Sequence, residues 1–282
     1  MKLGISLGSV NPRFWVPVTE AADRLGFESV WIPEHLIFPV GGQGSPHHGQ
    51  EHPPVPADIP TFDAFVYMGL LAGRTERVRF GTQVYNIGLR HPFSTARAVA
   101  TLDVISNGRV ELGIGASWLK EEWDAVGLDF ATRGRRVDEA IEICQLLWTE
   151  KVVEYHGEHF DFGPVMFEPK PVQSPIPLHI GGDGKAALRR AATVGAGWLP
   201  MNHSVEQLPE AMARIAELRR AAGRDDPVEL TVALPIEGKD DLERYAEAGI
   251  TRVIARPWTS SKEAIPGMER FAEELLPVAA AL

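Results

Sequence analysis

The sequence predicts a closed (β/α)8 barrel, an α/β fold in which eight parallel strands alternate with helices. The chain has 282 residues, of which 44% are hydrophobic, and barrels of this kind typically hold about 250 residues in one domain. Short apolar runs alternate with segments of helical spacing along the whole chain. Apolar strands separated by helices are typical of a parallel sheet covered by helices. We therefore expect residues 1–282 to form a single barrel domain.

Eight strand–helix units follow one another in order. The strands are predicted at residues 3–8, 29–33, 78–84, 110–115, 176–180, 196–199, 229–234 and 252–255. The helices are predicted at residues 14–25, 63–73, 94–105, 136–149, 185–194, 206–222, 240–248 and 263–276. Gly26 directly follows the first predicted helix, and the third predicted helix stops at Asn107-Gly108; glycine commonly ends a helix.

An open doubly wound sheet is the alternative to a barrel. That fold would need a Gly-x-Gly-x-x-Gly turn after its first strand to bind a dinucleotide. The first predicted strand has no such turn, and eight units favour closure of the sheet into a barrel.

Two insertions interrupt the repeat. Residues 39–61 follow the second strand, contain five prolines from Pro46 to Pro60 and fit no helix or strand pattern. A long loop at that position lies over the barrel mouth, so we expect a lid or a substrate-binding wall. Residues 152–172 alternate apolar and polar side chains around Gly157 and Glu158, which predicts a hairpin before the fifth barrel strand.

The first insertion also contains His47, His48 and His52. Histidine is a common metal ligand, but no carboxylate or cysteine accompanies these three at a spacing typical of a metal site. We therefore expect no bound metal.

The overall charge and composition favour a cytoplasmic protein but say little about its substrate. The formal net charge is −10 and the chain has no dense Lys/Arg run, which argues against nucleic acid as a partner. No run of about eighteen apolar residues predicts a membrane span, and the N-terminus lacks the pattern of a signal peptide. The single cysteine, Cys144, lies in a helical segment, where it is expected to pack in the core.

Two ionisable residues, Glu34 and His35, come directly after the second predicted strand. Groups at the C-terminal end of a barrel strand face the active-site mouth. Histidine can exchange a proton near neutral pH, and a neighbouring carboxylate can orient it. This predicts a catalytic pair, in which Glu34 assists His35. The alternative is a surface loop that merely contains the two residues.

Polar side chains also follow the third predicted strand. Thr82, Gln83, Tyr85 and Asn86 gather where the barrel opens, so their hydrogen-bonding groups could bind the edge of a heteroaromatic ring. His91 precedes a proline and is therefore expected to be extended and to stabilise its loop.

Glycines end the fourth and fifth predicted strands. Gly113 and Gly115 would let a flat ring or a phosphate approach the backbone, although a barrel corner that needs small residues explains them equally well. Gly181 and Gly182 precede a helix N-terminus, an arrangement that binds phosphate or carboxylate. A simple tight turn is the alternative there, and Asp183 is a candidate N-cap of the helix.

These motifs together closely resemble the bacterial luciferase-like monooxygenase superfamily, and within it the branch of coenzyme F420-dependent oxidoreductases. Their order and spacing carry the resemblance: Glu34-His35 after Val-Trp-Ile-Pro, Gly81-Thr82, Arg90-His91-Pro92, residues 107–115, residues 169–173 and Gly181-Gly182. The resemblance implies a TIM barrel with a flavin or 5-deazaflavin at its C-terminal mouth.

The resemblance also implies roles for single residues. Glu34 and His35 match the pair beside the reactive ring in F420-using relatives. A non-proline cis peptide, common in the family behind the ring, would fall at Gln83–Val84. Gly113 and Gly115 match glycines that contact the cofactor ring in the family. Gly181 and Gly182 match glycines that contact the cofactor phosphate.

One position departs from part of the family. Some sugar-phosphate-oxidising relatives carry a glutamate directly after the fourth-strand glycines, where this chain has Ala116, so a sugar-phosphate substrate is not expected. Glu121 and Glu122 lie nearby and are expected to begin a helix.

We therefore expect an F420-dependent oxidoreductase that transfers a hydride to or from a small organic substrate, and a homodimer, as is usual in the family. An FMN-dependent two-component monooxygenase and a non-catalytic flavin-binding homologue are the alternatives. Trp31, Tyr85 and Trp118 would suit a hydrophobic substrate, unless they belong to the core.

Overall fold

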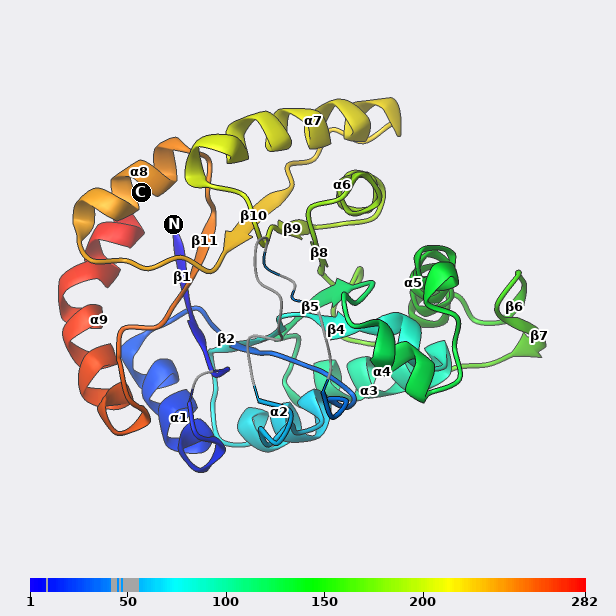
Figure 1. The fold of residues 1–282 in the computed structure, drawn as a ribbon, viewed down its shortest axis with the longest axis horizontal. Coiled ribbons are helices and arrows are strands. Elements are labelled where there is room, and N and C mark those ends of the chain that lie inside the picture. Colours follow the sequence, from blue (N-terminus) through cyan, green and yellow to red (C-terminus); the bar gives the residue numbers. More distant parts are fainter. Residues whose placement is uncertain (9, 42–44, 46, 48–55) are drawn as a thin grey trace.

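A computed structural model describes residues 1–8, 10–41, 45, 47 and 56–282. Within these residues, eight parallel strands close into a barrel with helices around it, which confirms the predicted fold (Figure 1). The order around the barrel is β3-β2-β1-β11-β10-β9-β8-β5, and pairing of β5 with β3 closes the ring. The barrel strands are β1 (Lys2–Ser6), β2 (Ser29–Ile32), β3 (Arg79–Thr82), β5 (Val110–Gly115), β8 (Leu178–Gly181), β9 (Gly197–Leu199), β10 (Glu229–Val232) and β11 (Arg252–Ala255).

The helices begin and end close to the predicted positions. They are α1 (Trp15–Leu25), α2 (Ala64–Ala72), α3 (Pro92–Ile105), α4 (Lys120–Ala125), α5 (Arg133–Thr149), α6 (Lys185–Thr193), α7 (Leu208–Ala221), α8 (Lys239–Glu247) and α9 (Ala264–Ala281). Short 3₁₀ turns cover Pro12–Phe14, Ile87–Leu89, Phe130–Thr132, Val205–Gln207 and Ser261–Glu263. In the part of the chain that the structure describes, no helix is both long and apolar enough to cross a bilayer.

Local sequence signals explain several helix ends. Gly26 takes a left-handed conformation with φ 93° and ends α1, as a glycine in this position allows. The Asp63 side chain accepts a hydrogen bond from the backbone N–H of Val66 at the start of α2. His91 is extended, as predicted, and its Nδ1 caps α3 by accepting from the N–H of Phe93 at 3.2 Å.

The third predicted strand is broken near its end. The peptide bond between Gln83 and Val84 is cis, and it separates β3 from the two-residue strand β4 (Tyr85–Asn86). β4 then pairs with the end of β5, where Asn86 lies opposite Gly115. The chain therefore bulges at the rim, where the sequence pattern alone predicts one continuous strand.

The insertion before the fifth barrel strand forms an antiparallel hairpin of β6 (Val153–His156) and β7 (Asp161–Val165). Figure 1 shows the hairpin on the outside of the barrel, beyond α5. The carboxylate of Glu139 in α5 accepts hydrogen bonds from three backbone N–H groups of the hairpin, at residues 158, 159 and 160. Most of the predicted lid at 39–61, including His48 and His52, lies outside the described residues.

Trp31 lies between an apolar cluster and a group of charged and polar side chains. Towards the C-terminal mouth, its fully buried indole packs with Leu199, Ile254 and Val84. A Cβ at Gly81 would lie 2.3 Å from the indole, so only glycine leaves room for the ring on the neighbouring strand.

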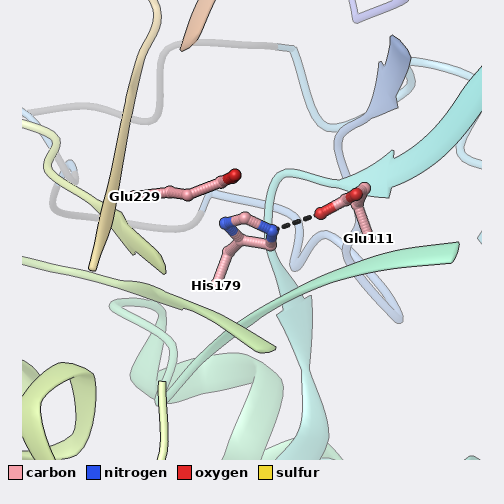
Figure 2. A group of neighbouring side chains, drawn as sticks. All are labelled: Glu111, His179 and Glu229. Atoms are coloured by element: carbon pink, nitrogen blue, oxygen red, sulfur yellow. Dashed lines mark hydrogen bonds and ion pairs between the residues drawn. The ribbon is translucent and has the colours of Figure 1, made fainter. Parts of the chain in front are cut away.

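A cluster of charged and polar side chains lies on the other side of Trp31, at the N-terminal ends of the strands. His179 in β8 is hydrogen-bonded to Glu111 in β5 (Figure 2). The fully buried guanidinium of Arg252 contacts Glu28 at 2.8 Å and Glu229 at 3.0 Å. The indole of Trp31 borders this cluster, 5.7 Å from the His179 ring and 5.5 Å from Cζ of Arg252.

Candidate functional site

The predicted site residues gather at the C-terminal rim of four neighbouring strands. His35 follows β2, Asn86 is in β4, Gly115 ends β5 and Gly181 ends β8. Since β2, β3, β5 and β8 are adjacent in the ring, the four chain segments meet at one side of the mouth, where barrel enzymes carry their active sites.

Glu34 does not orient His35, which differs from the prediction. Its carboxylate forms a buried ion pair with Arg90, and Oε2 accepts a hydrogen bond from the backbone N–H of Asn86 at 3.0 Å. Adjacent side chains in extended chain point to opposite sides, so consecutive residues such as Glu34 and His35 need not face one another. Glu34 therefore ties the loop after β2 to β4.

The carboxylate that reaches His35 belongs to Glu122, in the first turn of α4. Glu122 is fully buried, and its Oε2 lies 3.3 Å from Nδ1 of His35. The same carboxylate accepts hydrogen bonds from the backbone N–H of Leu36, from Nδ2 of Asn86 at 3.2 Å and from Oγ of Ser117 at 3.4 Å. Glu122 thus joins the loops after β2 and β5 to β4.

A sequence signal distinguishes Glu122 from Glu121, although both were predicted only to begin a helix. Both glutamates do lie in the first turn of α4. Glu122 is three residues after Leu119 and next to Trp123, and both of these side chains are buried. Residues three apart share a helix face, so the position of Leu119 predicts that Glu122, rather than Glu121, points inward. A buried carboxylate there needs hydrogen-bond donors.

The glycines of the rim make room for the cis bulge. A Cβ at Gly115 or at Gly181 would lie 2.8 Å from a methyl group of Val84, and a Cβ at Gly113 would lie 1.9 Å from the carbonyl oxygen of Thr82. The space beside these glycines is therefore filled by the chain itself. Val84 is packed between the ends of β5 and β8, which fixes where the Gln83–Val84 peptide lies.

The turn after β8 leads to a helix N-terminus that has no side-chain cap. Gly182 has φ 107°, a conformation that favours glycine. α6 begins at Lys185, and its N-cap residue is Gly184, which has no side chain to cap the helix. A Cβ at Gly184 would meet nothing within 4 Å. This end of α6 therefore has the features of an anion-binding helix N-terminus.

Asp183 is not the N-cap of α6, so that alternative is wrong. Its carboxylate instead accepts hydrogen bonds from the N–H of Met201 at 2.9 Å, from Asn202 and from Nδ1 of His203 at 2.9 Å. Burial would raise the pKa of Asp183, but these hydrogen bonds hold it below its usual value. Asp183 thus ties the loop after β8 to the loop after β9.

The aromatic residues expected at the mouth divide into two groups. Trp31 is fully buried and Tyr85 is 4% exposed, so both belong to the core, and burial raises the pKa of Tyr85 to about 12. Trp118 is only partly buried, and its ring lies 5.6 Å from His35, on which Phe38 also packs at 4.5 Å. Of Trp31, Tyr85 and Trp118, therefore, only Trp118 lies beside His35 at the rim.

The polar cluster at the other end of the barrel has the composition of a metal site. Ligand-type atoms of Glu111, His179 and Glu229 lie within 4.8 Å of one another (Figure 2). However, Glu111 is already paired with His179, and Glu229 with Arg252 and Lys2. A divalent ion would have to compete with a guanidinium that is wholly buried, so we assign the cluster to the structural core.

Comparison with known proteins identifies the family. Residues 3–274 match the family model of luciferase-like monooxygenases. The chain belongs to the luciferase-like monooxygenase family. This luciferase-like protein is accordingly an enzyme of the oxidoreductase class.

Two relatives and one solved structure show what the chain is similar to. An uncharacterized protein of Mycobacterium tuberculosis is 32% identical over 275 residues, which cover 93% of this chain and 94% of the other. An F420-dependent glucose-6-phosphate dehydrogenase of Amycolatopsis mediterranei is 28% identical over 277 residues, 94% of this chain and 78% of the other. An F420-dependent secondary alcohol dehydrogenase, solved with an F420–acetone adduct, shares the fold with a TM-score of 0.80 at 19% identity, covering 99% of this chain and 98% of the other.

Proposed function

We propose that this luciferase-like enzyme transfers a hydride between the 5-deazaflavin coenzyme F420 and a small organic substrate. The bound deazaflavin would supply the hydride chemistry, while the protein orients the reactants and handles the proton. The F420-dependent dehydrogenase among its relatives supports this choice of cofactor. The structural observation that carries the proposal is the meeting of His35, the Gln83–Val84 bulge and the glycine turn after β8 at one rim.

In this proposal His35 gives or takes the proton that accompanies hydride transfer. Its ring is held by packing against Phe38 and Trp118 and by the hydrogen bond to Glu122. Glu34, which is paired with Arg90, supports the rim and does not exchange protons.

The residues at the rim fit a ring that carries a phosphate. Gln83, Val84 and Asn86 form the bulge and the short strand against which a flat ring would lie. Beside them, Gly181 and Gly182 lead into the uncapped N-terminus of α6, whose N–H groups and dipole would hold the phosphate.

The first test is cofactor binding to the apo protein. Titration with F420 and, separately, with FMN should quench the fluorescence of F420 at lower protein concentration than that of FMN. With an identified substrate, His35→Ala should then lower turnover about 10²–10⁴-fold, the usual contribution of a general acid or base. Turnover within about twofold of wild type would show that His35 does not handle the proton.

An FMN-dependent two-component monooxygenase is the second candidate, since the family model describes monooxygenases. Preferential FMN binding, together with oxygen uptake that depends on an NADH-driven flavin reductase, would replace the F420 proposal with this one.

Glucose 6-phosphate is a useful negative control for the F420 proposal, since the chain has Ala116 where some sugar-phosphate-oxidising relatives have a glutamate. We expect no turnover of it with F420.

A further inference from the structure

We propose that Glu122 is the positioning residue of His35: its carboxylate holds the Nδ1–H tautomer of the imidazole and leaves Nε2 to exchange the proton. The inference rests on the proposed function only in giving His35 the proton-transfer role. Two observations on the described residues carry it, the 3.3 Å contact between Oε2 of Glu122 and Nδ1 of His35, and the complete burial of Glu122.

The chemistry of the two groups decides the tautomer. An ionised carboxylate has acceptors and no donor, so the ring nitrogen that faces it must carry a hydrogen. In the neutral imidazole of His35 the other nitrogen, Nε2, then holds the free lone pair. Nε2 is therefore the atom that accepts a proton and, in the charged ring, returns it. An orienting carboxylate acts in the same way on the histidine of hydrolase triads.

The surroundings of Glu122 suit a carboxylate. Four groups of the described residues donate hydrogen bonds to it: the backbone N–H groups of Leu36 and Ile37 to Oε1, and Nδ2 of Asn86 and Oγ of Ser117 to Oε2.

The same contacts make Glu122 an anchor for the backbone beside His35. The hydrogen bonds from the N–H groups of Leu36 and Ile37 hold the two residues that follow His35. The bond to Nδ1 holds the His35 ring. The imidazole is thus fixed from both the main chain and the side chain, as a preorganised catalytic group requires. Glu34 cannot replace Glu122, since its carboxylate is occupied by Arg90.

The first experiment measures the tautomer directly. Long-range ¹⁵N–¹H correlation spectra of the apo protein report which ring nitrogen of each histidine carries the hydrogen. The chain has nine histidines, so the signals of His35 are those lost in His35→Gln. We expect wild-type His35 in the Nδ1–H form at a pH where its ring is neutral. An Nε2–H form would overturn the proposal even if Glu122→Gln failed to fold.

The variant Glu122→Gln tests the cause. If its oxygen keeps the bond to the N–H of Leu36, its amide group presents a donor to Nδ1, and we expect His35 to shift towards the Nε2–H form. Glu121→Gln is the matched control, because it changes the adjacent, partly exposed glutamate and should leave the tautomer unchanged. An unchanged tautomer in folded Glu122→Gln would refute the assignment. These spectra need no cofactor and no turnover, so their outcome is independent of the proposed function.

Kinetics then separate positioning from general structural support. We expect Glu122→Gln to lower kcat at least about tenfold with little change in KM. The double variant His35→Gln/Glu122→Gln should be no slower than His35→Gln alone, because residues that act through one another are not additive. Multiplicative losses in the double variant, or a kcat of Glu122→Gln within twofold of wild type, would show that Glu122 does not act through His35.

Discussion

Replacing Glu111 by glutamine should make the stability of the barrel both lower and less dependent on pH. The side chain of Glu111 is 6% exposed and lies between His179, Arg79 and Arg252. Burial would raise its pKa, but the hydrogen bond from His179 and the charges of His179, Arg252 and Arg79 lower the pKa from 4.5 to about 2.

The direction of the pH dependence follows from this lowered pKa. The folded protein binds the proton of Glu111 less tightly than the unfolded chain does, so the carboxylate stabilises the fold above pH 4.5. That contribution is lost as the pH falls from 4.5 towards 2. The difference between the two pKa values corresponds to about 3 kcal/mol.

Urea unfolding of wild type and Glu111→Gln at pH 7, 5, 4 and 3, followed by both circular dichroism and tryptophan fluorescence, measures this contribution. We expect the free energy of unfolding of the variant to be about 3 kcal/mol lower than that of wild type at pH 7. This difference between the two proteins should become smaller as the pH falls. Glu158→Gln is the control, since its pair with Arg135 is exposed and worth less than about 1 kcal/mol. A gap between wild type and Glu111→Gln that is the same at pH 7 and pH 3 would refute the reasoning.

Three further expectations follow from the structure. Gly113→Ala should lower the unfolding temperature, since its Cβ would lie 1.9 Å from a backbone carbonyl; Gly163→Ala, with nothing within 4 Å, is the control for the same measurement. Arg90→Met should cost about 3–5 kcal/mol in urea unfolding, because it leaves the carboxylate of Glu34 buried without its cation; a loss below 1 kcal/mol would contradict this. We also expect a homodimer that buries the exposed apolar face of α2, where Val66 is 76% exposed. Val66→Glu should therefore sediment as a smaller species than wild type in sedimentation velocity. If the variant sediments like wild type, this face is not the dimer interface.

The repeating fold could be predicted because each unit carries its own local signals. Apolar runs, helical spacing and glycine stops such as Gly26 are short-range features, and the structure places the elements within a few residues of the predicted ranges. The break at Gln83–Val84 has no local signal and was expected only from family resemblance. It depends on Gly115 and Gly181 of two other strands, which leave the space that Val84 fills.

The candidate site was predicted less completely than the fold. His35 could be found from its place after a strand, but the identity of its carboxylate partner depends on how the loops after β2 and β5 meet. Proximity in sequence favoured Glu34, whereas three-dimensional packing supplies Glu122 from 87 residues further along the chain. Asp183 shows the same effect, because its partners lie 18 to 20 residues away, beyond β9.

The position of Trp31 across the barrel has a consequence for how this scaffold can change. Its indole separates the charged cluster around Arg252, at the N-terminal ends of the strands, from the rim that carries His35. Exchanging the loops at the rim should therefore leave the titration of that charged cluster unchanged. A new active site can then be introduced at the C-terminal end of the barrel without altering the N-terminal end. In an evolving lineage, such a partition would let substrate preference change while the folded state keeps the same dependence of its stability on pH.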